Sequence, residues 1–126
     1  MLLAGCVRIV YVRAPEPEYL VLRVLDGDTV VLDFNGDGLE QKNEHVRLGG
    51  YDAPEIRGVD DATKARGLAA KAYLESLILG RHVRYRHDAC GFYGRPIATI
   101  WVGENEINRE MIRWLKSNLT APLAAG

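Results

Sequence analysis

The chain lacks the features that would place it among membrane or repeat proteins. None of its apolar runs approaches the roughly 18 to 20 residues that a membrane-spanning helix needs. It has no internal repeat and no low-complexity tract. It has only two cysteines, Cys6 and Cys90, which either form one disulfide or have no structural importance, so they do not decide the redox compartment.

The chain also lacks the basic surplus that is usual in non-specific nucleic-acid binders, because its net charge is −1 and its pI is about 6.3. The net charge of the whole chain conceals a difference between its two halves. Residues 1–61 hold 6 Lys and Arg against 12 Asp and Glu, whereas residues 62–126 hold 10 against 5. An acidic half that collects a metal beside a basic half that meets a polyanion is one explanation, and two ordinary solvated surfaces are another.

What is present is enough for one compact domain. The chain has 126 residues, of which 48% are hydrophobic and 26% charged, so it can bury a real core. We expect residues 19–119 to form the domain, residues 1–18 to be an N-terminal extension or an extra strand, and residues 120–126 to be a tail. Within the extension, residues 7–12 are either a strand or a segment laid on the domain.

The pattern of apolar and turn residues predicts five strands and two helices. The strands are expected at residues 19–25, 29–34, 45–50, 82–87 and 96–102, the first three as an antiparallel meander. The first helix is expected at residues 62–79, with Asp61 or Thr63 as its N-cap and Gly80 after its end. Its expected apolar face consists of Ala65, Leu68, Ala69, Ala72, Tyr73 and Leu77.

The second helix is short and begins at Asn108, with Met111, Ile112 and Leu115 on one side. This order of elements predicts an α+β fold that is mainly β, a five-stranded barrel of the OB type with two packed helices.

Two acidic clusters lie at expected strand ends. Asp26-Gly27-Asp28 places two carboxylates two residues apart before a strand, and Asp52-Ala53-Pro54-Glu55 follows a strand directly. Hard oxygen ligands from separate strand ends suit calcium or magnesium. Each cluster taken alone is more often turn or capping chemistry.

Two arginines lie near these acids in the expected fold. Arg47 is three residues into the strand that leads to the second acidic cluster, and Arg95 follows a tight turn at Tyr93-Gly94. The planar guanidinium matches phosphate oxygens and stays charged at any working pH. For either arginine alone, a surface salt bridge is the simpler interpretation.

The segments are more specific together than apart. They are Leu25-Asp26-Gly27-Asp28-Thr29, Val46-Arg47-Leu48-Gly49-Gly50-Tyr51-Asp52-Ala53-Pro54-Glu55 and Tyr93-Gly94-Arg95, with Gly67-Leu68-Ala69-Ala70 and Ile107-Asn108 in the helices. In this order they resemble the staphylococcal (micrococcal) nuclease family of thermonuclease-like domains, and the resemblance covers residues 19–119.

The resemblance implies a metal site. In that family the positions that match Asp28 and Asp52 bind one calcium ion, and the position that matches Ala53 adds its backbone carbonyl. Asp26 matches an acid beside the metal, where it would orient water and the ligands.

The resemblance also implies the catalytic residues. Glu55 matches the residue held to orient or deprotonate the attacking water, and Arg47 and Arg95 match the pair that binds the scissile phosphate. Tyr93 matches a tyrosine that contacts the bound nucleotide. Where the family commonly has an acid two residues before this tyrosine, the chain has Gly91, which is expected to loosen the loop presenting Arg95.

A second acidic loop fits a different pattern. Residues 33–44 match the calcium-loop pattern D-x-[DN]-x-[DN]-G-x₅-E with Asp33, Asn35, Asp37 and Glu44 as its acidic and amide positions. The flanking runs are predicted as strands where that loop usually joins helices. The segment is therefore either a second, structural calcium site or a long polar hairpin.

The resemblance implies a calcium-dependent nuclease that cleaves DNA and RNA with little sequence preference, single strands preferred, and leaves 3′-phosphate ends. It implies a monomer with no stable protein partner. The alternative is a catalytically weak OB-type module that binds single-stranded nucleic acid or a protein, and loss of activity in EDTA distinguishes the two.

A non-specific nuclease is hazardous in a cytoplasm, so we expect the parent protein to be secreted or held at the cell surface. Leu3-Ala4-Gly5-Cys6 matches the processing box of a bacterial lipoprotein. Only two residues precede this box, whereas a signal needs an apolar stretch of about 7 to 15. Either an upstream leader is missing from this sequence or the match is accidental.

Overall fold

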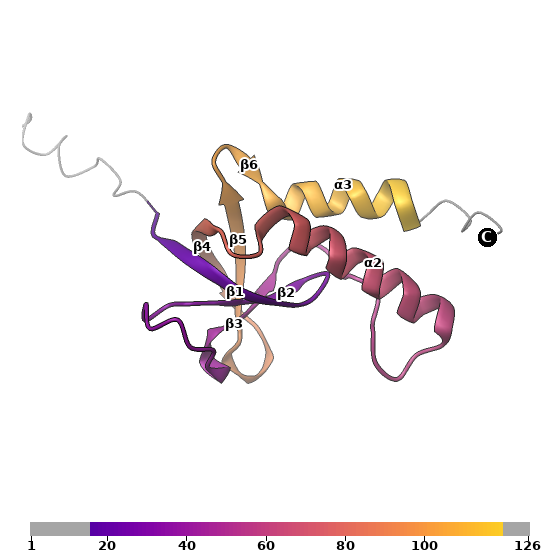
Figure 1. Ribbon diagram of the computed structural model, residues 1–126, viewed down its shortest axis with the longest axis horizontal. Helices are drawn as coiled ribbons and strands as arrows, with labels where there is room; N and C mark the ends of the chain where they lie inside the picture. The colour runs from indigo at the N-terminus through magenta and orange to yellow at the C-terminus, as the bar shows by residue number, and fades with distance from the viewer. Residues whose placement is uncertain (1–15, 120–126) are drawn as a thin grey trace, which may run out of the picture.

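The computed structural model of the chain describes residues 16–119 (Figure 1). The expectations for Leu3-Ala4-Gly5-Cys6, for residues 7–12 and for the tail at 120–126 lie outside the described residues. The elements in chain order are β1 (Glu18–Asp26), β2 (Thr29–Leu32), the 3-10 turn η1 (Lys42–Glu44), β3 (His45–Leu48), α2 (Asp61–Ile78), β4 (His82–Cys90), the 3-10 turn η2 (Phe92–Gly94), β5 (Pro96–Val102), β6 (Asn105–Glu106) and α3 (Ile107–Leu119).

The strands form one sheet in the order β3-β2-β1-β4-β5-β6, and parallel pairing of β3 with β5 closes five of them into a ring. The remaining pairings are antiparallel, including the β1-β2-β3 meander. A closed five-stranded ring with two packed helices is an OB-type α+β fold. The predicted fold class is therefore confirmed.

The β1–β2 hairpin turns within two residues. Asp26 pairs with Thr29 across the ladder, which leaves Gly27 and Asp28 as the loop. The side chain of Asp26 accepts a hydrogen bond from the backbone N–H of Asp28 at 2.9 Å and so stabilises the turn. The hairpin thus fixes both carboxylates at one end of the barrel.

The N-cap of α2 (Asp61–Ile78) lies one residue before Asp61, the first of the two predicted caps. Asp60 is the N-cap, because its backbone is extended and its side chain accepts a hydrogen bond from the N–H of Thr63 at 2.7 Å. This bond lowers the pKa of the Asp60 carboxyl. The prediction of Asp61 or Thr63 was therefore wrong. Gly80 follows the helix with φ of +75°, a conformation that favours glycine, as predicted.

The buried face of α2 also differs from the prediction. The residues buried along this helix are Gly67, Ala70, Leu74 and Ile78. Of the predicted face, Leu68 is 45% exposed, whereas Tyr73 and Leu77 lie at the edge of the core. The observed stripe has the same helical period in a different phase. Alanines occur on several faces of α2, and a glycine lies in its buried stripe. The size of the side chains therefore did not indicate which face of the helix is buried.

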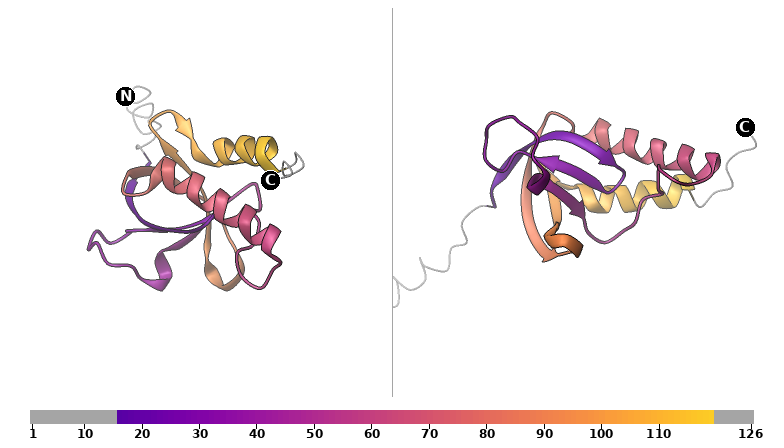
Figure 2. Two further views of the ribbon diagram at one scale, coloured as in Figure 1. Left: turned by 45° about the vertical axis from the view of Figure 1, so that its right-hand side comes forward. Right: turned by 90° about the horizontal axis from the view of Figure 1, so that it is seen from below.

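The two helices lie side by side against one end of the barrel (Figures 1 and 2). Tyr73 of α2 stacks on Trp114 of α3 with ring centroids 4.9 Å apart, and the Tyr73 hydroxyl donates to Glu110. Met111 is fully buried, and Leu115 packs on the core from the same helix, as predicted. The helices therefore cover the core at the end where the hairpin turn and the residues 49–60 lie.

Candidate active site

Three surface cavities share the side chain of Arg95. The first, here the Asp52 cavity, has a volume of about 400 Å³ and lies between the end of β3 and η2. The second, the Glu55 cavity, has a volume of about 420 Å³ and contains Asp26 as well as Glu55. The third, the Lys42 groove, lies between η1 and η2 with a volume of about 810 Å³. Arg95 is therefore the point at which the three hollows meet.

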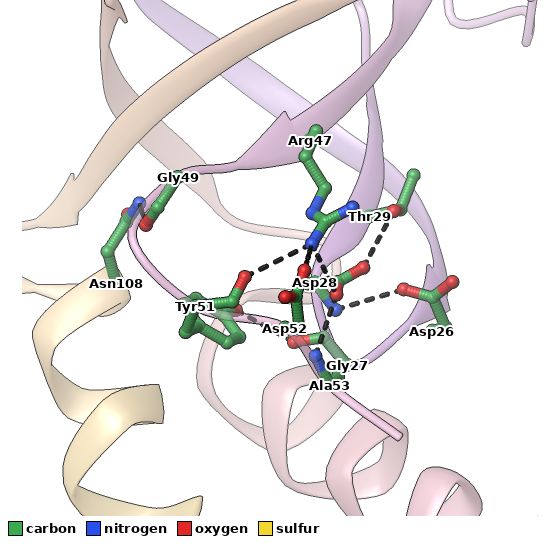
Figure 3. A network of polar contacts seen from close by, with 10 residues as sticks. All are labelled: Asp26, Gly27, Asp28, Thr29, Arg47, Gly49, Tyr51, Asp52, Ala53 and Asn108. Carbon is green, nitrogen blue, oxygen red and sulfur yellow. Dashed lines mark hydrogen bonds and ion pairs between the residues drawn. The ribbon is translucent and has the colours of Figure 1, made fainter. Parts of the chain in front are cut away.

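Asp28 is buried and connects the hairpin turn with the loop after β3 (Figure 3). One carboxylate oxygen accepts from the hydroxyl of Thr29 at 3.0 Å, and the other accepts from the backbone N–H of Ala53 at 2.8 Å. Burial raises the pKa of Asp28 to about 6, and neighbouring Asp26 adds to the rise, whereas Ala53 and Arg47 act in the opposite direction. The fold thus buries the carboxylate of Asp28 in surroundings that favour its protonated, neutral form.

Arg47 extends from β3 into this acidic cluster (Figure 3). Its guanidinium lies 3.2 Å from the Asp28 carboxylate, also pairs with Asp52, and donates to the backbone carbonyl of Tyr51 at 3.1 Å. The side chain of Asp52 is otherwise open, with 91% of it exposed. Arg47 therefore places a positive charge between the two carboxylates predicted to bind metal.

Glu55 and Arg95 have no such partners. Neither side chain makes a hydrogen bond or ion pair with another of the residues described, and both are exposed. They line the Glu55 cavity together with Asp26. In this cavity the carboxylate is free to accept hydrogen bonds from water, and the guanidinium is free to bind an anion such as a phosphate.

The cluster fits a divalent cation by its chemistry. Its donors are hard carboxylate oxygens. The pKa of its most buried member, Asp28, is raised, and a nearby cation would lower that pKa again. The guanidinium of Arg47 already lies between Asp28 and Asp52, so the cluster accommodates positive charge. The fit is incomplete in one respect. In the described part of the chain, three acidic side chains reach within 4.8 Å of one another only in the loop of Asp33, Asp37 and Glu44.

The chain is similar in sequence to a known protein family. The family model described as "Staphylococcal nuclease homologue" matches residues 45–114, which is more than half of the chain. The chain belongs to this family. The matched region includes the β3 strand, the loop that follows it, α2 and η2, and so most of the candidate active site.

Several curated relatives of the family are similar to the chain. It is 33% identical to "Thermonuclease" of Staphylococcus intermedius over 97 residues, which are 75% of the chain and 55% of that protein. It is 29% identical to "Thermonuclease" of Staphylococcus hyicus over 103 residues, which are 80% of the chain and 58% of that protein. It is 35% identical to "Probable endonuclease LCL3" of Yarrowia lipolytica over 85 residues, which are 64% of the chain and 38% of that protein. The chain thus spans little more than half the length of the two thermonucleases.

The site residues of this family member come together to different degrees. The sequence prediction named residues that now lie in contact or in adjoining cavities, namely Asp26, Asp28, Arg47, Asp52, Ala53, Glu55 and Arg95. The backbone of Tyr93 lies in η2, but its side chain is outside the described part of the structure. The roles assigned to all these residues stay predictions.

Two glycines, Gly27 of the predicted acidic cluster and Gly67 of α2, allow the loop after β3 to pack closely. A Cβ atom at Gly27 would lie 2.7 Å from the Cβ atoms of Ala53 and Ala70. A Cβ atom at Gly67 would lie 2.7 Å from the carbonyl oxygen of Glu55 and 2.8 Å from that of Pro54. The signal for the second was a glycine inside a predicted helix, which often marks close backbone approach.

A polar residue of α3 holds the other end of this loop. The amide of Asn108 donates to the carbonyl oxygens of Gly49 and Ala98, both at 2.9 Å, and accepts from the N–H of Ile100 at 3.1 Å. The sequence pattern predicted Asn108 as the start of a helix, which in fact begins at Ile107. The residue instead ties the end of β3 to β5, and so supports the loop that carries Asp52.

Substituting Gly67 by alanine is expected to destabilise the protein by about 1–3 kcal/mol, because the added methyl group collides with two backbone carbonyls. Helix propensity alone predicts the opposite sign, a gain of about 1 kcal/mol. Urea denaturation of the two proteins separates these effects. A Gly67→Ala variant that is more stable than the unsubstituted protein would contradict the steric account of how α2 positions Glu55.

The acidic loop between β2 and β3 is strongly structured. Asp33 accepts from the N–H groups of Gly36 and Gly38 at 3.1 and 2.8 Å, and Glu44 accepts from the N–H of Phe34 at 3.0 Å. These two acids are buried and come within 4.8 Å of the exposed Asp37. Three members of the predicted calcium loop thus converge.

The fourth member has a different contact. The side-chain oxygen of Asn35 accepts from the N–H of Asp37 at 3.1 Å, which is turn chemistry. The loop is thus partly consistent with each of the two alternatives, a calcium site and a polar hairpin.

Proposed function

We propose that the chain is a calcium-dependent nuclease that hydrolyses phosphodiester bonds of DNA and RNA with little sequence preference and leaves 3′-phosphate ends. Family membership and the names of the relatives support this proposal. The observation that carries it is local. The guanidinium of Arg95 and the carboxylate of Glu55, which have no partner in the described part of the chain, line one cavity with Asp26. This cavity adjoins the turn from which buried Asp28 reaches Arg47.

The acids of the turn and of the following loop would hold the calcium ion. Asp28 and Asp52 would supply carboxylate oxygens and Ala53 its backbone carbonyl, while Asp26 would orient the neighbouring ligands. When bound, the cation supplies a Lewis acid and a template for the phosphate. Arg47 now pairs with both carboxylates, so cation binding would free its guanidinium for substrate.

The remaining residues would carry the reaction. Arg95 and Arg47 bind non-bridging oxygens of the phosphate and stabilise the charge that builds on them. Glu55 accepts a proton from water as the water oxygen bonds to phosphorus. The bond between phosphorus and the 5′ oxygen breaks, the phosphate stays on the 3′ oxygen, and the 5′ oxygen takes up a proton from solvent. Tyr93 is proposed to contact the bound nucleotide.

The experiment that tests this function is incubation of the purified protein with single-stranded DNA and, separately, RNA in millimolar calcium, with an EDTA arm. Cleavage that stops in EDTA and resumes when calcium is restored is the expected result. The alternative, an OB-type binding module, predicts retained binding without cleavage in both arms. An exposed aromatic side chain, Phe92 at 88% exposure, is the feature that such a module would use.

A second, structural calcium site at residues 33–44 stays a proposal of its own. If it exists, calcium titration should give two sites per chain in the unsubstituted protein and one in an Asp37→Asn variant, because Asp37 is the exposed member of the converging acids. Asp37→Asn should leave calcium-dependent cleavage unchanged. A single site in both proteins would show that the loop is a polar hairpin.

The cellular context is also proposed. We infer an extracellular or surface-held parent protein from the hazard of a non-specific nuclease and from Leu3-Ala4-Gly5-Cys6, which lies outside the described residues. Among the described residues, no helix is long and apolar enough to span a membrane. We further propose that the protein acts as a monomer on single-stranded nucleic acid.

A further inference from the structure

The Lys42 groove is a distinct hollow that adjoins the candidate active site. It shares Arg95 and Phe92 with the Asp52 cavity, but its other lining residues, including Lys42 and His45, are different. Its volume of about 810 Å³ is roughly twice the 400 Å³ of the Asp52 cavity. A strand that places its scissile phosphate at Arg95 therefore has a hollow for each of the two nucleotides that this phosphate joins.

The groove has the chemistry of a single-strand binding surface. Lys42 is exposed and pairs with none of the described residues, so its ammonium group is available to a phosphate. The ring of Phe92 is 88% exposed, the arrangement that base stacking requires. The nearby acid Glu40 already pairs with Arg23 at 2.7 Å and with His45 at 3.5 Å, so its charge is matched.

Both walls of the groove are held by backbone contacts. On the η1 side, buried Glu44 accepts from the N–H groups of Gln41 and Phe34 at 3.1 and 3.0 Å. On the η2 side, the N–H of Gly91 donates to the carbonyl of Arg95 at 2.7 Å, and the N–H of Arg95 donates back to Phe92 at 3.3 Å. The surface is thus formed before substrate binds, which lowers the entropy cost of binding.

We propose that the Lys42 groove binds the nucleotide on the opposite side of the scissile phosphate from the one in the Asp52 cavity. Phe92 stacks on the base of that nucleotide, and Lys42 contacts the phosphate that follows it. This inference rests on the proposed function, because it takes Arg95 as the contact of the scissile phosphate. It identifies the substrate as a strand that continues beyond a dinucleotide.

The test compares two single-stranded DNA substrates, a dinucleotide that has only the scissile phosphate and a hexanucleotide. Lys42→Ala is expected to lower kcat/KM for the hexanucleotide about fivefold, and Lys42→Glu more strongly, through loss of one charged contact. Neither variant should change kcat/KM for the dinucleotide. The slope of log kcat/KM for the hexanucleotide against log salt should become shallower by about 0.7 in Lys42→Ala.

Lys64→Ala is the matched control, since Lys64 is an exposed lysine on α2 outside the groove. It should match the unsubstituted protein on both substrates. Lys42 variants that behave like Lys64→Ala, or that lose equal activity on both substrates, would overturn the proposed role of the Lys42 groove. The proposed nuclease function would still hold if the unsubstituted protein cleaves the hexanucleotide. A hexanucleotide left intact by the unsubstituted protein in calcium would overturn the proposed function and this inference with it.

Discussion

Replacing Arg95 by alanine is expected to lower kcat/KM for nucleic-acid cleavage by about 10²–10³-fold, as removal of one preorganised donor to a transition-state oxyanion does. The guanidinium is exposed and has no partner among the described residues, so the fold does not depend on it. The free energy of unfolding should change by no more than about 0.5 kcal/mol. Arg95→Lys should recover only part of the loss, because an ammonium lacks the planar fork that binds two phosphate oxygens.

The matched control for Arg95 is Arg81→Ala, an exposed arginine between α2 and β4 that lines none of the three cavities. It should retain full activity. Steady-state kinetics on a single-stranded substrate and urea denaturation, carried out on the same preparations, separate a catalytic effect from a folding effect. Equal activity of the Arg95→Ala and Arg81→Ala variants would contradict the role given to Arg95.

Asp28→Asn is expected to remove a pH-dependent loss of stability from the metal-free protein while it abolishes function. The folded-state pKa of Asp28 is about 6, above the roughly 3.9 of an unfolded aspartate, because burial disfavours the charged form. As the pH rises from about 4 to about 6, the unfolded state loses its proton first, so the folded protein loses stability relative to it. Asparagine does not titrate and escapes this cost.

In EDTA the stability of Asp28→Asn relative to the unsubstituted protein should therefore rise between about pH 4 and pH 6 and then level off, a gain with pH of up to about 3 kcal/mol. Added calcium at neutral pH should stabilise the unsubstituted protein and not the variant, since the cation stabilises only the protein that binds it. Calcium affinity should fall by more than the roughly 10- to 100-fold that loss of an outer contact costs. Urea denaturation across pH, with and without calcium, measures all three effects. The same change of stability with pH in both proteins between about pH 4 and pH 6 in EDTA would contradict the account.

Local patterns in the sequence predicted most elements because each has a local cause. Apolar runs separated by Asp26-Gly27-Asp28 and by a polar loop predict the β1-β2-β3 meander, and the helical period predicts α2 to within one residue at each end. Even so, β4 continues three residues past its predicted end, to Cys90, with a register irregularity after His87. A bulge of this kind is set by the partner strand β5 and leaves no clear local signal.

Contacts between distant segments were not predictable from the same patterns. The parallel pairing of β3 with β5 joins Arg47 to Ile97, and the two-residue strand β6 is too short to produce a period. The phase of α2 depends on Gly67 facing the carbonyls of Pro54 and Glu55, a contact that looks from sequence like a weak point in a helix.

The candidate site was predictable as a set of residues but not as an arrangement. Motif order placed Asp28, Arg47 and Asp52 together, because Asp28 lies in the turn before β2, Arg47 lies in the neighbouring strand β3, and Asp52 lies in the loop after β3. It did not predict that Arg47 pairs with both carboxylates, nor that Tyr51 donates its hydroxyl to the carbonyl of Gly27 at 2.7 Å. Such pairings depend on which charges are buried, and this is known only once the loop after β3 is packed.

The most direct measurement is the rate of calcium-dependent cleavage of single-stranded DNA by the unsubstituted protein and by Glu55→Ala, with calcium binding measured for both. Glu55 is exposed and pairs with none of the residues that the structure describes, so its loss should leave the fold and calcium binding intact. Cleavage by the unsubstituted protein that falls about 10²–10⁴-fold in Glu55→Ala, with products that carry 3′-phosphate ends, is the predicted result. Calcium binding without cleavage by either protein would contradict the enzyme account and favour the binding module.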